Sequence, residues 1–223
     1  ATGWTDVQSA GSYRLERRDD DAVFGFSVGP HSWKKVLHEP VLSLWRVCRE
    51  KGGLRLQENE SGAERLALIG VRACELAAIA VQDRVFLGGT HVDPHYAKRR
   101  AGVFIVAVNC GQAGGTCFCT SMGTGPRVSS GFDLGLTELL TATSHDFLVE
   151  VGTASGADTL GAVPFAVAQP AQCAQADEIV ARAAKQMSRS LNTTGIKELL
   201  SRTLEHPRWE ETARRCLACA NCT

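Results

Sequence analysis

The sequence predicts a mixed fold of the α/β or α+β class, in which an N-terminal domain of strands and helices is followed by a helical segment. Two short apolar runs, residues 65–71 and 103–108, have the length and β-branched content of buried strands. The last third of the chain carries apolar residues at helical spacing instead. Hydrophobic residues make up 44% and charged residues 22% of the 223 residues, so a sizeable core is expected rather than disorder.

The first half of the chain is expected to begin irregularly and then to form a helix, a strand and a second helix. Residues 1–30 are rich in glycine and charge, and we expect no functional residue there. Apolar positions in residues 36–49 recur at helical spacing, which predicts an amphipathic helix with Cys48 packed on its apolar face. Residues 65–71 then predict a strand, and residues 74–80 predict the helix that follows it.

The second half begins with the strand 103–108, which leads into a glycine-rich loop. Two more strands are expected over residues 132–139 and 147–151. The last third predicts helices, and His206-Pro207 interrupts their pattern. The expected helices have one face made of Ile179, Val180, Ala183, Ala184 and Met187, another made of Ile196, Leu199, Leu200 and Leu204, and a last short helix from Trp209.

Charge and hydropathy argue against two classes of protein. Lysine plus arginine and aspartate plus glutamate each number 24, and the resulting net charge of zero disfavours a protein that coats nucleic acid. No purely apolar run is longer than that of residues 103–108, which is far shorter than the ~18 residues that span a bilayer. The first residues lack the apolar centre of a signal peptide, so we expect a cytoplasmic protein with no membrane partner.

The cysteines are the most informative residues, because nine of them in a chain without a secretory signal favour metal binding over disulfides. Cys110, Cys117 and Cys119 form one group, and Cys74 is the candidate fourth thiolate. Cys74 and Cys110 each follow a predicted strand, and sites collect at the carboxyl ends of strands in open α/β sheets. Four thiolates suit an iron–sulfur cluster or a tetrahedral zinc, and simple thiol redox or inert thiols stay open.

A second cysteine group stands at the end of the sequence, where Cys216, Cys219 and Cys222 follow the pattern C-x2-C-x2-C. This is the first part of the bacterial ferredoxin run, and it favours an iron–sulfur cluster over zinc. The fourth ligand of that run is missing, so we expect these residues to be the front part of a longer protein. The expected organisation is an α/β domain that binds a cluster at 1–170, a helical connector at 171–215, and the start of a truncated ferredoxin-like dicluster domain at 216–223.

Five segments, in the same order along the chain, are similar to one known family. They are GVRACELAAI at 70–79, QDRVFL at 82–87, DPHY at 93–96, the cysteine loop 110–126, and GFDLGLTEL at 131–139. Together they resemble the iron–sulfur beta subunit of cytoplasmic NiFe hydrogenases and sulfhydrogenases, a 4Fe-4S dicluster domain protein that is related to one of the subunits of anaerobic sulfite reductase. The resemblance covers roughly residues 65–223.

The resemblance implies an electron-transfer subunit with no catalytic centre of its own. It would relay single electrons between two partners. One is a flavin- and NAD(P)-binding subunit, and the other is a NiFe hydrogenase module made of small and large subunits. An anaerobic sulfite reductase-type complex is the alternative. The cofactors implied are 4Fe-4S clusters, one held by Cys74, Cys110, Cys117 and Cys119, and a second given three ligands by Cys216, Cys219 and Cys222.

Two hypotheses of other classes stay open beside this one. A zinc-stabilised interaction module would have no redox role, and a thiol–disulfide enzyme would use Cys117 and Cys119 as its dithiol. Neither explains the second cysteine group. Arg72 and Glu75 flank Cys74, and a surface ion pair is favoured for them over the balancing of a cluster's charge. No nucleotide-binding glycine motif and no catalytic nucleophile with its base is recognisable.

Overall fold

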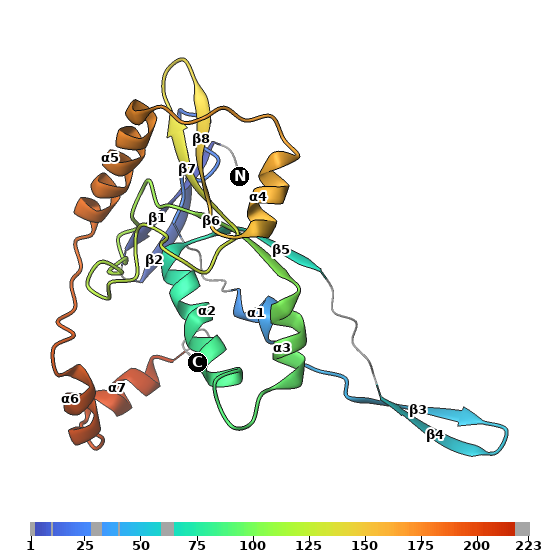
Figure 1. Cartoon of the computed structure of the whole chain (residues 1–223). Helices are drawn as coiled ribbons and strands as arrows, with labels where there is room; N and C mark the ends of the chain where they lie inside the picture. The colour runs from blue at the N-terminus through green and yellow to red at the C-terminus, as the bar shows by residue number, and fades with distance from the viewer. Residues whose placement is uncertain (1–2, 10, 28–32, 40, 59–64, 217–223) are drawn as a thin grey trace.

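The computed structural model describes residues 3–9, 11–27, 33–39, 41–58 and 65–216. Within them it contains eight strands in three separate sheets and seven helices. A four-stranded sheet lies at the centre of the molecule, and the other elements are arranged around it (Figure 1). This mixture of strands and helices confirms the predicted fold class, while the predicted domain boundaries at 170 and 215 stay predictions.

The central sheet has the strand order β5-β6-β7-β8. Its strands are β5 (Leu66–Val71), β6 (Val103–Val108), β7 (Leu134–Leu140) and β8 (His145–Val151). The first three run parallel to one another, and β8 is antiparallel to β7. All four lie at the predicted positions to within a few residues, because the apolar content of a sheet covered by other elements is easily read from sequence.

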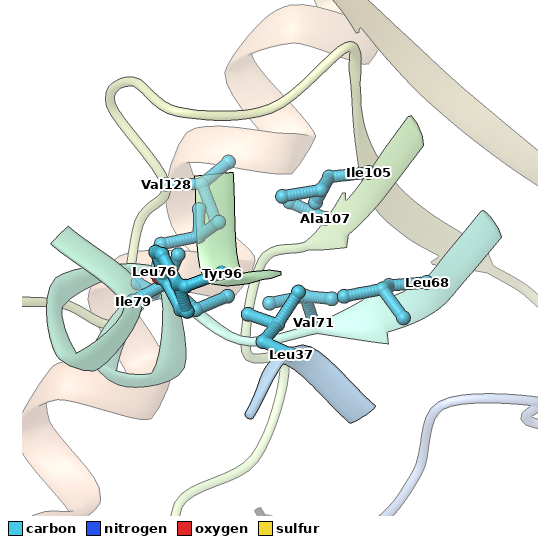
Figure 2. Close-up of a cluster of buried hydrophobic side chains, with 10 residues drawn as sticks. Leu37, Leu68, Val71, Leu76, Ile79, Tyr96, Ile105, Ala107 and Val128 are labelled. Carbon is cyan, nitrogen blue, oxygen red and sulfur yellow. The ribbon is translucent and has the colours of Figure 1, made fainter. Parts of the chain in front are cut away.

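Two helices form the crossover from β5 to β6, namely α2 (Ala73–Phe86) and α3 (Pro94–Ala101). Asp93 caps α3, because its carboxylate accepts hydrogen bonds of 2.9 Å from the backbone N–H groups of His95 and Tyr96. The largest buried cluster joins these helices to the sheet (Figure 2). Its buried members are Leu37, Leu68, Val71, Ala73, Leu76, Ile79, Tyr96, Ile105, Ala107 and Val128.

Two antiparallel hairpins make up the other sheets. The first pairs β1 (Trp4–Ser9) with β2 (Ser12–Arg17), and the second pairs β3 (Trp45–Glu50) with β4 (Gly53–Glu58). The first hairpin contacts the loop between β6 and β7, and in Figure 1 the second extends away from the rest of the molecule. The first hairpin corrects the expectation of an irregular lead-in, which failed because every residue of β2 is exposed and the strand has no buried face to read.

The helix predicted over residues 36–49 is wrong. Among the described residues of this stretch only those of α1 (Lys34–Leu37) are helical, and Cys48 is half buried in β3 rather than on the apolar face of a helix. Trp45 and Val47 alternate with polar residues, and aromatic and β-branched side chains favour a strand. The helical spacing was therefore coincidental, and the alternation of Trp45 and Val47 with polar residues was the better signal.

The last third is helical, as predicted. It contains α4 (Ala154–Gly161), which was not predicted, and then α5 (Pro170–Gln186), α6 (Ile196–Arg202) and α7 (Arg208–Arg214). Helix α5 packs against β7 and β8, whereas α6 and α7 bury no residue. None of the described helices is long and apolar enough to cross a membrane. The residues of α5 that are buried are Ala176, Val180 and Ala183.

Candidate metal centre

The parallel strands β5 and β6 deliver two cysteines to one edge of the central sheet. Cys74 follows β5 in the first turn of α2, and Cys110 follows the end of β6. Because the two strands are parallel neighbours, their carboxyl ends lie at the same edge. The expectation that two strand ends bring cysteines to facing loops is thus met by the topology.

The loop that follows Cys110 carries two more cysteines back to this edge. Its ends are joined by a hydrogen bond of 3.2 Å from the backbone N–H of Cys110 to the carbonyl oxygen of Pro126. Inside the loop, the N–H of Cys117 donates to the carbonyl of Gly114 at 3.0 Å. The carbonyl of Cys119 accepts two further backbone hydrogen bonds, at 3.0 and 3.1 Å. The loop is therefore a folded unit rather than an open connection.

Two glycines allow close approaches that a side chain would block. A Cβ atom at Gly125 would lie only 3.0 Å from Cys119 Sγ and 3.2 Å from the Cβ of Ala73, at the start of α2. A Cβ atom at Gly115 would lie 2.1 Å from the carbonyl oxygen of Gln8 in β1. Glycine is thus required at both places. At residue 125 it lets the loop approach the start of α2, which carries Cys74, and at residue 115 it lets β1 pack against the loop.

The thiols at this edge interact with one another electrostatically. Burial raises the pKa of Cys74 to about 12, and the thiols of Cys110, Cys119 and Cys117 and the carboxyl of Glu75 add to that effect. Burial also raises the pKa of Cys110 and of Cys119, again with contributions from neighbouring thiols. The structure therefore brings the predicted group together. Thiolate anions are disfavoured here unless a cationic group compensates them.

The cysteine group does not form a cage for one metal ion in this structure. Within the described residues, no three histidine, cysteine, aspartate or glutamate side chains converge on the position of a single metal ion. Four thiolates on one zinc, at Zn–S distances of about 2.3 Å, would lie about 3.8 Å apart. A cubane cluster is larger and holds its thiolates further apart, and thiolates are its usual ligands. The donor set of four thiols on a glycine-containing loop fits a group of that kind.

The second cysteine group is placed only in part. Cys216 is exposed at the end of the described chain, just after α7. Cys219 and Cys222 lie outside the described residues, as does the predicted start of a ferredoxin-like domain. The assignment of these three cysteines to a cluster stays a prediction.

The first hairpin holds the cysteine loop from one side, a role that the sequence did not reveal. The hydroxyl of Thr116 donates to Gln8 Oε1 at 2.9 Å, and the amide of Gln112 donates to Thr5 Oγ1 at 3.0 Å. Figure 1 shows β1 next to this loop. The contacts come from polar side chains on a largely exposed hairpin, so no local motif could have signalled them.

The end of α5 holds the loop from another side. The Gln186 side chain accepts a hydrogen bond of 3.0 Å from the backbone N–H of Ala113. The thioether sulfur of Met187 accepts from the Cys119 thiol at 3.8 Å and from the Thr120 hydroxyl at 3.5 Å. The sequence assigns Met187 to an apolar helix face, and its contact with a candidate ligand is new.

Arg72 corrects the expectation of a surface ion pair with Glu75. Its side chain is 1% exposed, and its guanidinium donates to the carbonyl oxygens of Asn109 at 3.2 Å, Phe24 at 3.0 Å and Phe26 at 2.8 Å. The Glu75 carboxylate instead accepts the backbone N–H of Arg72 at 2.8 Å. Arg72 therefore lies inside the candidate site, next to Cys110, rather than on the surface.

Comparison with known proteins identifies a relative. The chain is similar to the beta subunit of sulfhydrogenase 2 from Pyrococcus furiosus, with 31% identity over 175 residues. The match covers 76% of this chain and 50% of that subunit, so the chain spans about half the length of its relative. No family model and no solved structure matches the chain.

Proposed function

The chain is a relative of the hydrogenase and sulfhydrogenase beta subunits, and from this premise we propose that it is an electron-transfer subunit that binds iron–sulfur clusters. The observation that carries the proposal is the meeting of four thiols at the carboxyl edge of β5 and β6. Burial raises the pKa of Cys74, Cys110 and Cys119, so these three thiols ionise less readily by themselves. A cationic metal cluster would compensate their charge when they ionise.

In this proposal the two cysteine groups have separate roles. Cys74, Cys110, Cys117 and Cys119 hold one 4Fe-4S cluster, which when bound supplies one-electron redox chemistry. The group at the end of the chain gives three ligands to a second cluster, in a ferredoxin-like domain. Its members are Cys216, Cys219 and Cys222.

The chain itself holds the site. The four thiols are half buried, and backbone hydrogen bonds keep the loop that begins at Cys110 folded. Hydrogen bonds near the sulfurs and the degree of burial set a cluster's reduction potential. These are the contributions that a protein without a catalytic centre of its own makes to electron transfer.

The partners follow from the same relationship. We infer that the chain works in the cytoplasm and connects two partners. One is a flavin- and NAD(P)-binding subunit, and the other is a NiFe hydrogenase module made of small and large subunits. The flavin subunit would split a hydride's electron pair, and this chain would pass the electrons on one at a time.

The first experiment measures iron, acid-labile sulfide and zinc in the anaerobically purified chain, with an EPR spectrum of the reduced sample. We expect about four iron and four sulfide for each cluster. Cys117→Ala should remove one cluster's iron and signal, and Cys48→Ala, which changes a cysteine of the distant β3–β4 hairpin, should leave both intact. Zinc without sulfide would refute the electron-transfer role and support the zinc-stabilised module.

A further inference from the structure

Arg72 is a buried cation that, among the described residues, forms no hydrogen bond with a carboxylate, although the Glu75 carboxylate interacts with it electrostatically. Its guanidinium donates to the backbone carbonyl oxygens of Asn109, Phe24 and Phe26, and one donor, Nε, is buried with no hydrogen-bond partner among the described residues. The rings of Phe24 and Phe26 lie 5.7 and 5.3 Å from its Cζ atom. Carbonyl dipoles and ring faces orient a guanidinium, but they do not neutralise its charge.

A buried charge that no carboxylate binds directly is costly, so proteins keep one where a further group compensates it. The group beside Arg72 that gains from a positive charge is Cys110. The guanidinium donates to the carbonyl oxygen of Asn109, the residue directly before Cys110, at 3.2 Å. Arg72 thus stands where an anion is expected when the candidate site is filled, and the unused Nε donor is available to it.

We propose that Arg72 is the fixed countercharge of the cluster site at Cys110, and that it raises the reduction potential of that site. This inference rests on the proposed function. Each reduction adds one electron, given by a reduced flavin and later passed to an oxidised acceptor, with no covalent bond formed or broken. The positive charge stabilises the added negative charge, because the buried surroundings screen it weakly. Arg72 acts through the cluster's surroundings and is a positioning residue.

Arg18 offers a matched control. Its guanidinium also ties the segment near Phe24 to the cysteine loop, donating to Gly25 O at 3.2 Å and Gln112 Oε1 at 2.8 Å. Its charge, however, is paired with the Asp20 carboxylate at 2.6 Å. Replacing Arg18 removes comparable hydrogen bonds from the same region without removing a charge that no carboxylate binds directly.

The test is an EPR-monitored redox titration with dithionite on the full chain, following the signal that Cys117→Ala removes. Arg72→Gln keeps amide donors and loses the charge, whereas Arg72→Lys keeps the charge. At a fixed solution potential near the wild-type midpoint, we expect the ratio of reduced to oxidised cluster to fall at least tenfold in Arg72→Gln, which is about 59 mV for one electron. Arg72→Lys and Arg18→Gln should stay within threefold of the wild type.

Iron and sulfide content, measured on the same samples, separates the possible failures. A wild-type chain that holds no cluster overturns the proposed function together with this inference. A loaded wild type whose ratio is unchanged in Arg72→Gln overturns the role of Arg72 alone. Loss of the cluster in both Arg72 variants, with Arg18→Gln still loaded, also overturns it, because Arg72 would then act only by holding the backbone.

Discussion

The carboxyl edge of the central sheet and the β3–β4 hairpin carry cysteines in opposite surroundings. At the sheet edge, the loop that begins at Cys110 is contacted by β1 through Gln112 and by the end of α5 through Ala113. In the hairpin, Cys48 stands on strands whose contacts are with each other, and Val47 and Leu56 opposite one another are 60% and 61% exposed. The difference teaches that the surroundings of a cysteine depend on how many separate segments meet around it. Substitutions at the sheet edge should therefore change stability far more than substitutions in the hairpin.

The largest contrast is expected from removing one apolar side chain in each region. Ile105 in β6 is 2% exposed, and Ile105→Ala should destabilise the fold by about 2–5 kcal/mol, because it leaves a cavity in the core. Leu56→Ala in β4 should change the free energy of unfolding by less than about 0.5 kcal/mol. Urea unfolding of both variants measures the difference, and equal losses would show that the hairpin is packed in solution.

Features of the two regions that depend on neighbouring residues could be predicted from the sequence, whereas features that depend on distant segments could not. The strands at 65–71 and 103–108 and the cysteines after them could be predicted, because apolar runs and cysteine spacing are local patterns. The burial of Arg72 could not, since the carbonyl groups that bind it come from residues 37, 46 and 48 positions away. The hairpin was missed because apolar residues at exposed strand positions imitate the spacing of a helix.

A backbone contact gives the next contrast. Gly115→Ala places a Cβ 2.1 Å from the carbonyl oxygen of Gln8, so β1 and the cysteine loop must separate. We expect a loss of about 1–3 kcal/mol from this overpacking, together with reduced iron content. In the hairpin, Gly52→Ala meets no atom within 4 Å and should be nearly neutral. Thermal unfolding and iron analysis of both variants would decide, and a neutral Gly115→Ala would mean that β1 does not cover the loop.

Acid should weaken the support of the sheet edge through Asp6 in β1. Burial raises the pKa of this carboxyl, but hydrogen bonds from the backbone and side chain of Ser27 and from Gln8 outweigh it and leave the pKa below its ordinary value. The stability it provides is present above the unfolded value of about 3.9 and is lost as the pH falls through the lower native value. Asp6→Asn should cost about 1–2 kcal/mol at pH 7. Urea titrations at pH 7 and pH 3 should show the gap from wild type narrowing in acid, and a constant gap would contradict this role of Asp6.

The smallest contrast compares two polar contacts. Thr116→Val removes the 2.9 Å hydrogen bond to Gln8 and should cost about 0.5–1.5 kcal/mol. Arg55→Ala removes an exposed 3.3 Å ion pair with Glu50 in the hairpin and should cost less than about 0.5 kcal/mol. Chemical denaturation at low and moderate salt distinguishes them, because only the ion pair is screened. A salt-dependent effect at Thr116 would refute the assignment.

The way the cysteine loop is held also fixes an order of assembly. Thr116 pairs with a residue 108 positions earlier, and Ala113 pairs with one 73 positions later. Contacts between such distant segments form late, because the chain must lose conformational entropy before these contacts can stabilise the fold. During synthesis on the ribosome the loop therefore cannot reach its final form until residue 187 has emerged. If the loop holds a cluster as proposed, the cluster would be inserted only after α5 has been translated, into a site that closes last.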